Sequence, residues 1–192
     1  MPRVKQFNQE EVVEKAVHLF WEKGFHATSM QDIVDTLGIN RASIYDTFGS
    51  KRELFNLTID RYKNQNVERV SNFLFRHSNI REGLHLLFES SIDEGLDKNK
   101  PNGCFIVNTT SELGDDPELN QKLVENKTAF EKIYFDYLKL GVEQSQVSPY
   151  KDLKEIASYL FTLQAGIKVI SNLHQSREDL MKIVSTGLTV LN

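Results

Sequence analysis

Apolar residues recur three and four positions apart along almost the whole chain, which is the spacing of one face of an α-helix. The chain has only four prolines, at Pro2, Pro101, Pro117 and Pro149, so no proline forbids a helix within residues 3–100. No stretch alternates apolar and polar residues between hairpin signals, as a half-buried strand does. The pattern predicts an all-α protein of about nine helices, with a small N-terminal unit and a larger C-terminal bundle.

Capping residues divide the first seventy-odd residues into four helices. A polar residue that can cap a helix precedes each expected start, at Asn8, Thr28 or Ser29, Asn40 and Ser50. A glycine follows each of the first three helices, at Gly24, Gly38 and Gly49. The second and third helices are short and are joined by a glycine-containing turn. This arrangement, within Thr28–Phe55, is the helix-turn-helix pattern.

The third helix, Arg41–Phe48, has one face suited to DNA. At ~100° per residue, Ile44 and Phe48 point inward, which leaves Ala42, Ser43, Tyr45 and Asp46 on the outward arc. Small side chains at Ala42 and Ser43 let the backbone approach a DNA groove. The next helix begins at Ser50–Lys51 with free N–H groups and a cation, a combination that binds phosphate. A purely structural helical hairpin has the same spacing, so the spacing alone leaves both interpretations open.

A longer set of positions distinguishes the two interpretations. It comprises Ala16, Leu19, Phe20, Gly24, Phe25, Thr28, Ser29, Asp32, Ile33, Leu37, Gly38, Ile39, Ile44, Tyr45, Phe48, Ser50, Lys51 and Leu54. This set resembles the DNA-binding domain of TetR-family transcriptional regulators. The resemblance implies a homodimer whose recognition helix, here Arg41–Phe48, enters the major groove of a palindromic operator, and a repressor that a small ligand releases.

The resemblance also assigns roles to single residues. Thr28, Tyr45 and Lys51 match positions that touch the DNA backbone or flank the bases, and with Arg41, Ala42 and Ser43 they are the predicted DNA-binding residues. Two positions depart from the family pattern. Asp46 replaces a frequent histidine, and its carboxylate is repelled by phosphates unless it accepts from a cytosine amino group or points aside. Val34 replaces a frequent alanine, which affects local packing.

The charge distribution permits DNA binding by the N-terminal unit. The first 63 residues contain nine Lys or Arg and nine Asp or Glu, so the net charge of −4 arises in the remainder of the chain. A protein that coats DNA as an architectural component carries abundant basic residues over its whole surface. The overall isoelectric point near 5.8 argues against that class.

Other classes of function lack the residues they need. A single cysteine excludes an internal disulfide and a thiolate zinc site, and the five scattered histidines predict no metal or cofactor. No apolar run exceeds four residues, so we expect no membrane span and a cytoplasmic location. There are no catalytic candidates: no paired carboxylates, no nucleophile beside a base and no phosphate-binding glycine loop. The alternative is an all-helical small-molecule-binding protein or enzyme whose N-terminal helices are only structural.

The last two helices predict a subunit interface. Ser148 followed by Pro149 predicts the start of a helix that runs to about Leu173. Its apolar residues cover almost the whole circumference: Ile156, Tyr159, Leu160, Phe161, Leu163, Ile167, Val169, Ile170 and Leu173. A helix that is apolar all round must be buried on all sides. Together with the last helix, it predicts a homodimer face, with a central helix of a monomeric bundle as the alternative.

Residues 51–192 are expected to form the ligand-binding and dimerisation bundle, and residues 1–50 the DNA-binding domain with an N-terminal arm at 1–7. The ligand candidates are polar or aromatic residues among apolar stripes: His85, Phe88, Cys104, Asn108, Phe130, Tyr134 and Gln164. Aromatic residues at helical spacing are equally typical of a plain core. Cys104 is either a packed small apolar residue or a redox or electrophile sensor.

Overall fold

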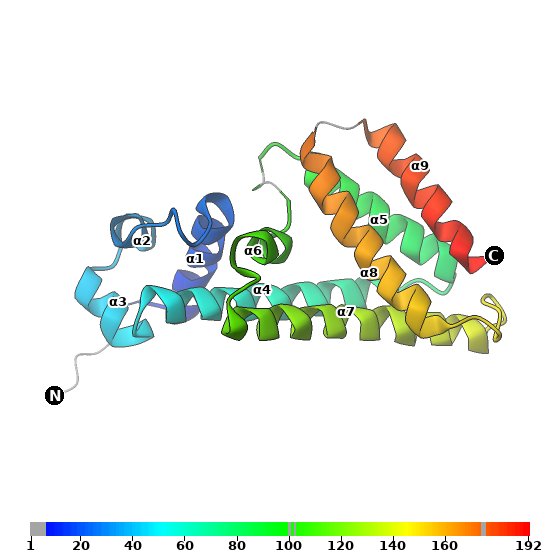
Figure 1. Cartoon of the computed structure of the whole chain (residues 1–192), viewed down its shortest axis with the longest axis horizontal. Helices are drawn as coiled ribbons and strands as arrows, with labels where there is room; N and C mark the ends of the chain where they lie inside the picture. Colours follow the sequence, from blue (N-terminus) through cyan, green and yellow to red (C-terminus); the bar gives the residue numbers. More distant parts are fainter. Residues whose placement is uncertain (1–6, 100, 102, 174–175) are drawn as a thin grey trace.

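The computed structural model describes residues 7–99, 101, 103–173 and 176–192 (Figure 1). Those residues form nine α-helices and no strand, which confirms the predicted all-α fold. The helices are α1 (Gln9–Lys23), α2 (Met30–Leu37), α3 (Arg41–Phe48), α4 (Lys51–Leu74), α5 (Ile80–Leu96), α6 (Phe105–Leu113), α7 (Pro117–Glu143), α8 (Leu153–Ile170) and α9 (Arg177–Gly187). Short 3₁₀ turns follow α8 at Ser171–Leu173 and α9 at Leu188–Leu191.

The caps explain where the N-terminal helices begin. The Asn8 side chain accepts from the backbone N–H of Glu10, and Asn40 and Ser50 likewise cap α3 and α4. Ser29 caps α2 in a reciprocal capping box with Asp32, so Ser29 rather than Thr28 is the N-cap. Gly38 ends α2 in the left-handed conformation at φ 67°, which sets the turn into α3.

The start of α8 differs from its prediction. The helix begins at Leu153 rather than at Ser148–Pro149, because the Asp152 carboxylate accepts from the backbone N–H groups of both Lys154 and Glu155. Aspartate caps a helix about as well as serine does, and its negative charge is in addition stabilised by the positive end of the helix dipole. Residues 148–150 form a turn that leads into this cap.

Two apolar cores share the long helix α4. The N-terminal core joins α1, α2 and α3 to the first half of α4 and also takes in α6 and the start of α7. The C-terminal core joins the second half of α4 to α5, α7, α8 and α9. In Figure 1, α4 and α7 run side by side along the long axis, with α1–α3 gathered at one end and α5, α8 and α9 packed at the other. The 24 residues of α4 span about 36 Å, so one helix connects the two cores directly.

Candidate DNA-binding and effector sites

The helix α3 presents the predicted DNA-facing arc to solvent. Ile44 and Phe48 are buried against the N-terminal core, whereas Arg41 and Ala42 are exposed, Ser43 is half-buried and Tyr45 is 41% exposed. The Arg41 guanidinium lies 5.7 Å from the centre of the Tyr45 ring, and its Nη2 lies 3.5 Å from the Tyr45 hydroxyl. The two side chains therefore form one surface patch along a single turn of the helix. Asp46 is exposed on the same helix.

The start of α4 places two cations over one aromatic ring. Lys51 Nζ lies 4.4 Å and the Arg52 guanidinium 4.7 Å from the centre of the Phe25 ring. Arg52 is also paired with Asp116 at 2.7 Å, whereas no carboxylate of a described residue pairs with Lys51. Partial burial lowers the pKa of Lys51, an effect that the carboxylates of Glu112 and Asp32 oppose. Of these two cations, Lys51 is the one available to a phosphate.

The Thr28 side chain, which the resemblance predicts to touch DNA, is buried in the structure. Thr28 is 1% exposed, and its hydroxyl donates to the carbonyl oxygen of Gly24 at 2.6 Å. This hydrogen bond closes the turn between α1 and α2. The side chain thus supports the helix-turn-helix unit. The arm at 1–7 lies outside the described residues except for Phe7.

A contact between the two units was not predicted from the sequence. Glu112, near the end of α6, accepts from the backbone N–H groups of Phe25 at 3.0 Å and His26 at 2.7 Å. These N–H groups belong to the turn that follows α1. Gly24 has φ 78°, a conformation that favours glycine, and a Cβ atom there would lie 2.7 Å from Glu112 Oε2. Because these residues are almost ninety positions apart, no local pattern indicates the contact.

Three predicted ligand residues meet at a small internal cavity. Cys104, Phe130 and Gln164 line a space of about 40 Å³ between α4, α6, α7 and α8, together with Tyr62, Asn66, Ile106, Val107, Asn126, Phe161, Ala165 and Lys168. Tyr134 lies behind this inner cavity, where its hydroxyl donates to Gln164 Oε1 at 2.9 Å. Gln164 Nε2 in turn donates to Ser91 Oγ at 3.4 Å. Gln164 therefore links α7, α8 and α5 through hydrogen bonds at both ends of its amide.

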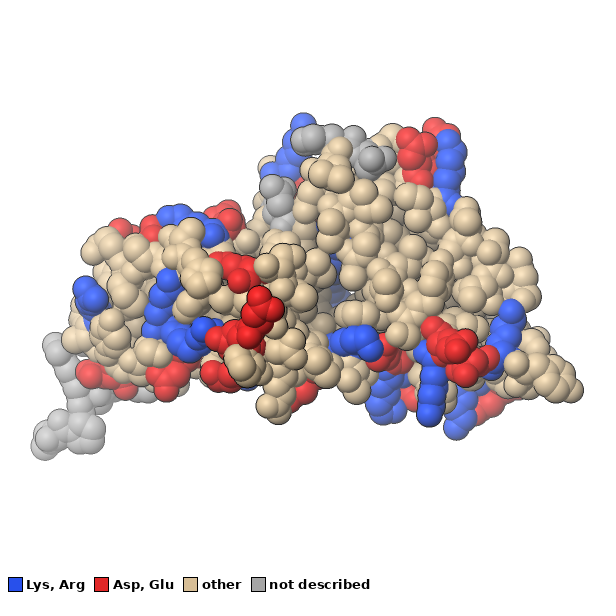
Figure 2. Space-filling model, in the orientation of Figure 1, with Lys and Arg blue, Asp and Glu red and all other residues tan. Residues whose placement is uncertain are grey.

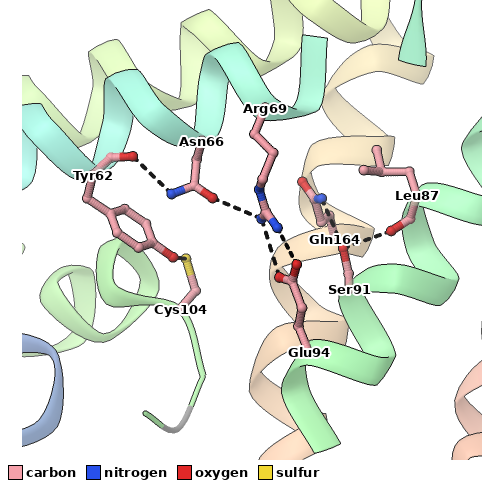
Figure 3. A network of polar contacts seen from close by, with 8 residues as sticks. All are labelled: Tyr62, Asn66, Arg69, Leu87, Ser91, Glu94, Cys104 and Gln164. Atoms are coloured by element: carbon pink, nitrogen blue, oxygen red, sulfur yellow. Dashed lines mark hydrogen bonds and ion pairs between the residues drawn. The ribbon is translucent and has the colours of Figure 1, made fainter. Parts of the chain in front are cut away.

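Cys104 is buried at the start of α6. Its sulfur lies 3.6 Å from the Tyr62 hydroxyl, and the backbone carbonyl of Cys104 accepts the first hydrogen bond of the helix (Figure 3). Burial, with the sulfur close by, raises the pKa of Tyr62 well above its usual value. The phenol is therefore neutral at physiological pH. A buried thiol in contact with a neutral phenol fits the packing role better than the sensor role.

A larger cleft adjoins the inner cavity. It has a volume of about 400 Å³ and lies between α1, α4, α5 and α8. Its lining includes Glu14, Val17, His18, Trp21, Tyr62, Gln65, Asn66, Arg69, Ser91, Glu94 and Lys168. Figure 3 shows a chain of polar contacts among residues of its lining, in which Arg69 Nη2 donates to Asn66 Oδ1 at 3.0 Å and Arg69 also pairs with Glu94. Tyr62, Asn66 and Lys168 line both spaces.

The other predicted ligand residues lie elsewhere. Phe88 is fully buried in the C-terminal core, Asn108 is exposed on α6, and His85 faces a separate shallow groove beside Glu89 and Ser185. None of the three lines the cleft or the inner cavity. Sequence reasoning missed Tyr62, Asn66 and Arg69, although their spacing of four and three places them on one face of α4.

Two further classes of site were tested against the same part of the chain. No group of three His, Cys, Asp or Glu among the described residues is placed to hold a metal ion. Over those residues, no helix combines the length and the hydropathy required to cross a membrane.

Taken together, a helix-turn-helix unit with an exposed face on α3 and a helical bundle with an internal cavity define a DNA-binding regulator with a ligand-binding domain. Comparison with known families agrees. Residues 12–57 match the family described as bacterial regulatory proteins, tetR family, and residues 82–186 match the tetracyclin repressor-like C-terminal domain. The second match alone spans more than half of the chain. The chain belongs to the TetR family and is a DNA-binding transcriptional regulator.

Similar proteins carry related names. The chain is 27% identical over the full length of both chains to the uncharacterized HTH-type transcriptional regulator YezE of Bacillus subtilis. It is 27% identical to the HTH-type transcriptional repressor ComR of Escherichia coli, over 97% of this chain and 90% of ComR. Its fold matches that of the regulator CifR, solved in complex with 26-bp operator DNA, with a TM-score of 0.86, 22% identity and coverage of 99% and 100% of the two chains.

Proposed function

We propose that the chain is a homodimeric transcriptional repressor that holds two copies of α3 against a palindromic operator and leaves it when a small molecule binds. The observation that carries the proposal is the exposed patch of Arg41, Ala42 and Tyr45 on α3, beside the uncommitted cation of Lys51. An exposed aromatic ring with a guanidinium beside a helix N-terminus suits a groove bordered by phosphates. Repressor is the word used for ComR and for the similar protein BdcR, both of Escherichia coli.

An apolar face on α8 and α9 supports the dimer. Four large apolar side chains on this face are between 39% and 67% exposed: Tyr159 and Val169 of α8, Leu173 of the 3₁₀ turn that follows it, and Ile183 of α9. Figure 2 shows few charged side chains on the face over α8, in contrast to the ends of the molecule. Contiguous exposed apolar surface of this kind is typical of a subunit interface. We therefore place the partner subunit against α8 and α9.

The helix α6 offers a physical connection between ligand and DNA. Its first turn begins at Cys104 on the inner cavity, and Glu112 near its last turn holds the backbone at Phe25 and His26. A ligand that shifts α6 would move the turn that positions α2 and α3. We place the effector in the cleft and inner cavity for this reason.

We further propose that the two parts of the chain have separate roles and that neither catalyses a reaction. Residues 1–50 form the DNA-binding domain and residues 51–192 the ligand-binding and dimerisation bundle, with the first half of α4 packed into the N-terminal core. The regulator acts in the cytoplasm, needs no cofactor or metal and has no catalytic residues. The alternative of an enzyme or carrier with merely structural N-terminal helices does not explain the exposed patch on α3.

Selection of bound duplexes from a random DNA pool tests this proposal. We expect the recovered sites to share a palindrome, because two α3 helices related by a twofold axis read two inverted half-sites. The half-site centres should lie about one or two helical turns apart. Recovery of no common sequence, or of a single unrepeated motif, would contradict the proposed homodimer on DNA.

A further inference from the structure

The carboxylates that line the cleft are already neutralised. Glu14 accepts from Arg61 at 3.3 Å and from Gln65 at 2.9 Å. Glu94 is held by Arg69, whose guanidinium also donates to Asn66. Lys168, on α8, makes no hydrogen bond or ion pair with any described residue, although it lines both the cleft and the inner cavity. Its ammonium group is therefore an uncompensated positive charge where the two spaces meet.

The inner cavity contains a second unpartnered polar group. Asn126, on α7, is only 4% exposed, lines this cavity, and forms no hydrogen bond within the described part of the chain. Gln164 lines the same cavity but has its amide bonded at both ends. The Asn126 amide therefore has no hydrogen bond within the described chain that a ligand entering the cavity would have to displace. Asn126 and Lys168 are thus two residues with hydrogen-bond donors that line one small space.

The sizes of the two spaces determine which part of a ligand each can hold. A volume of about 40 Å³ accommodates roughly three water-sized atoms, which is the size of a carboxylate group. The cleft of about 400 Å³ lies in the range of small-molecule sites and has Val17, Trp21 and Tyr62 in its wall. The Trp21 and Tyr62 rings pack edge to face at 5.2 Å and present an aromatic surface.

We propose that the effector is an amphipathic organic acid. Its carboxylate accepts from Lys168 Nζ and Asn126 Nδ2, and its apolar body lies in the cleft against Val17, Trp21 and Tyr62. The body contacts α1 of the DNA-binding unit while the head group lies among α4, α7 and α8. That this acid regulates DNA binding rests on the proposed function, whereas the binding site and the chemical class of the ligand do not.

Trp21 provides a local probe, because it is the single tryptophan of the chain and lines the cleft. Binding of 9-anthracenecarboxylate and of its neutral carboxamide can be followed by quenching of Trp21 fluorescence through energy transfer to the anthracene ring. The two probes share their ring system and differ in charge. We expect the acid to bind the wild-type protein about tenfold more tightly than the amide, which corresponds to one charge-assisted hydrogen bond.

Matched variants separate this site from non-specific binding. Lys168→Gln should remove the tenfold preference for the acid, whereas Lys154→Gln, an exposed change on the same helix, should leave it intact. Asn126→Leu should also weaken binding of the acid. It should not lower the thermal stability of the unliganded protein, because the Asn126 amide has no hydrogen-bond partner to lose. Equal binding of the two probes, no binding of the acid, or an undiminished preference in Lys168→Gln would overturn the proposal.

Measurement of DNA affinity with and without the acid, beside these titrations, distinguishes this proposal from the proposed function. If the acid binds through Lys168 but leaves DNA affinity unchanged, the organic-acid site stands and ligand release fails. If the acid does not bind at Lys168 and the protein still selects a palindrome, DNA binding stands and the organic-acid site is wrong.

Discussion

Replacing Gly166 with glutamate is expected to convert the dimer to folded monomers. Gly166 lies on α8 near the exposed Val169, and a Cβ atom added there meets no atom of its own chain within 4 Å. The variant should therefore leave the subunit intact, and a helix gains about 1 kcal/mol when an interior glycine is replaced. In the dimer, the same carboxylate would be buried against an apolar partner surface without a counter-charge, at a cost of several kcal/mol.

The expected result is a rise in the dimer dissociation constant of at least about 100-fold, measured by sedimentation, with an unchanged or higher melting temperature at low concentration. Lys139→Gln on α7 makes the same change in net charge at an exposed position and should leave the dimer intact. Ile170, another apolar residue of α8, is less suitable because it packs against the core of its own subunit. A Gly166→Glu protein that remains a dimer would place the interface elsewhere.

Loss of the Lys51 side chain is expected to weaken binding to every duplex by a similar factor. Each phosphate contact contributes about −0.9 to the slope of log affinity against log salt concentration. A dimer that uses three or four cations per subunit should show a slope of roughly −5 to −7. Lys51→Ala removes one contact from each subunit, so the slope should become less steep by about two.

Arg52 offers an informative comparison for Lys51. Arg52 is the next residue in the chain and lies over the same Phe25 ring, but its guanidinium is paired with Asp116. Removing Lys51 should therefore change the salt slope, whereas Lys139→Ala, at the far end of α7, should not. An unchanged slope in Lys51→Ala would show that this lysine does not meet a phosphate.

The sequence predicted the helices and the exposed face of α3 because both depend on local patterns. Caps such as Asn8 and Ser29 and the spacing of Ile44 and Phe48 act within one or two helical turns, so each can be read from neighbouring residues. The sequence does not indicate the hydrogen bond from Thr28 to Gly24, which turns the hydroxyl inward. The start of α8 was misplaced because Ser148–Pro149 and Asp152 are competing local signals.

The lining of the cleft and the inner cavity was predicted only in part because it is assembled from distant segments. Cys104, Phe130 and Gln164 were found as polar or aromatic residues in apolar stripes, but that criterion also selected Phe88, which is plain core. Asn126 and Lys168 resemble solvent-facing residues in sequence, and only the packing of α7 and α8 against α4 places them at a cavity. The contact made by Glu112 cannot be predicted from the sequence for the same reason, since its partners lie almost ninety residues away.

The central claim is that two subunits read two half-sites together. The most direct test compares the affinity for a selected palindromic duplex with that for a duplex of the same length and composition in which one half-site is scrambled. At a fixed salt concentration, we expect the intact palindrome to bind at least about 100-fold more tightly, because the second α3 is left with only non-specific contacts on the scrambled duplex. Equal affinity for the two duplexes would contradict the claim.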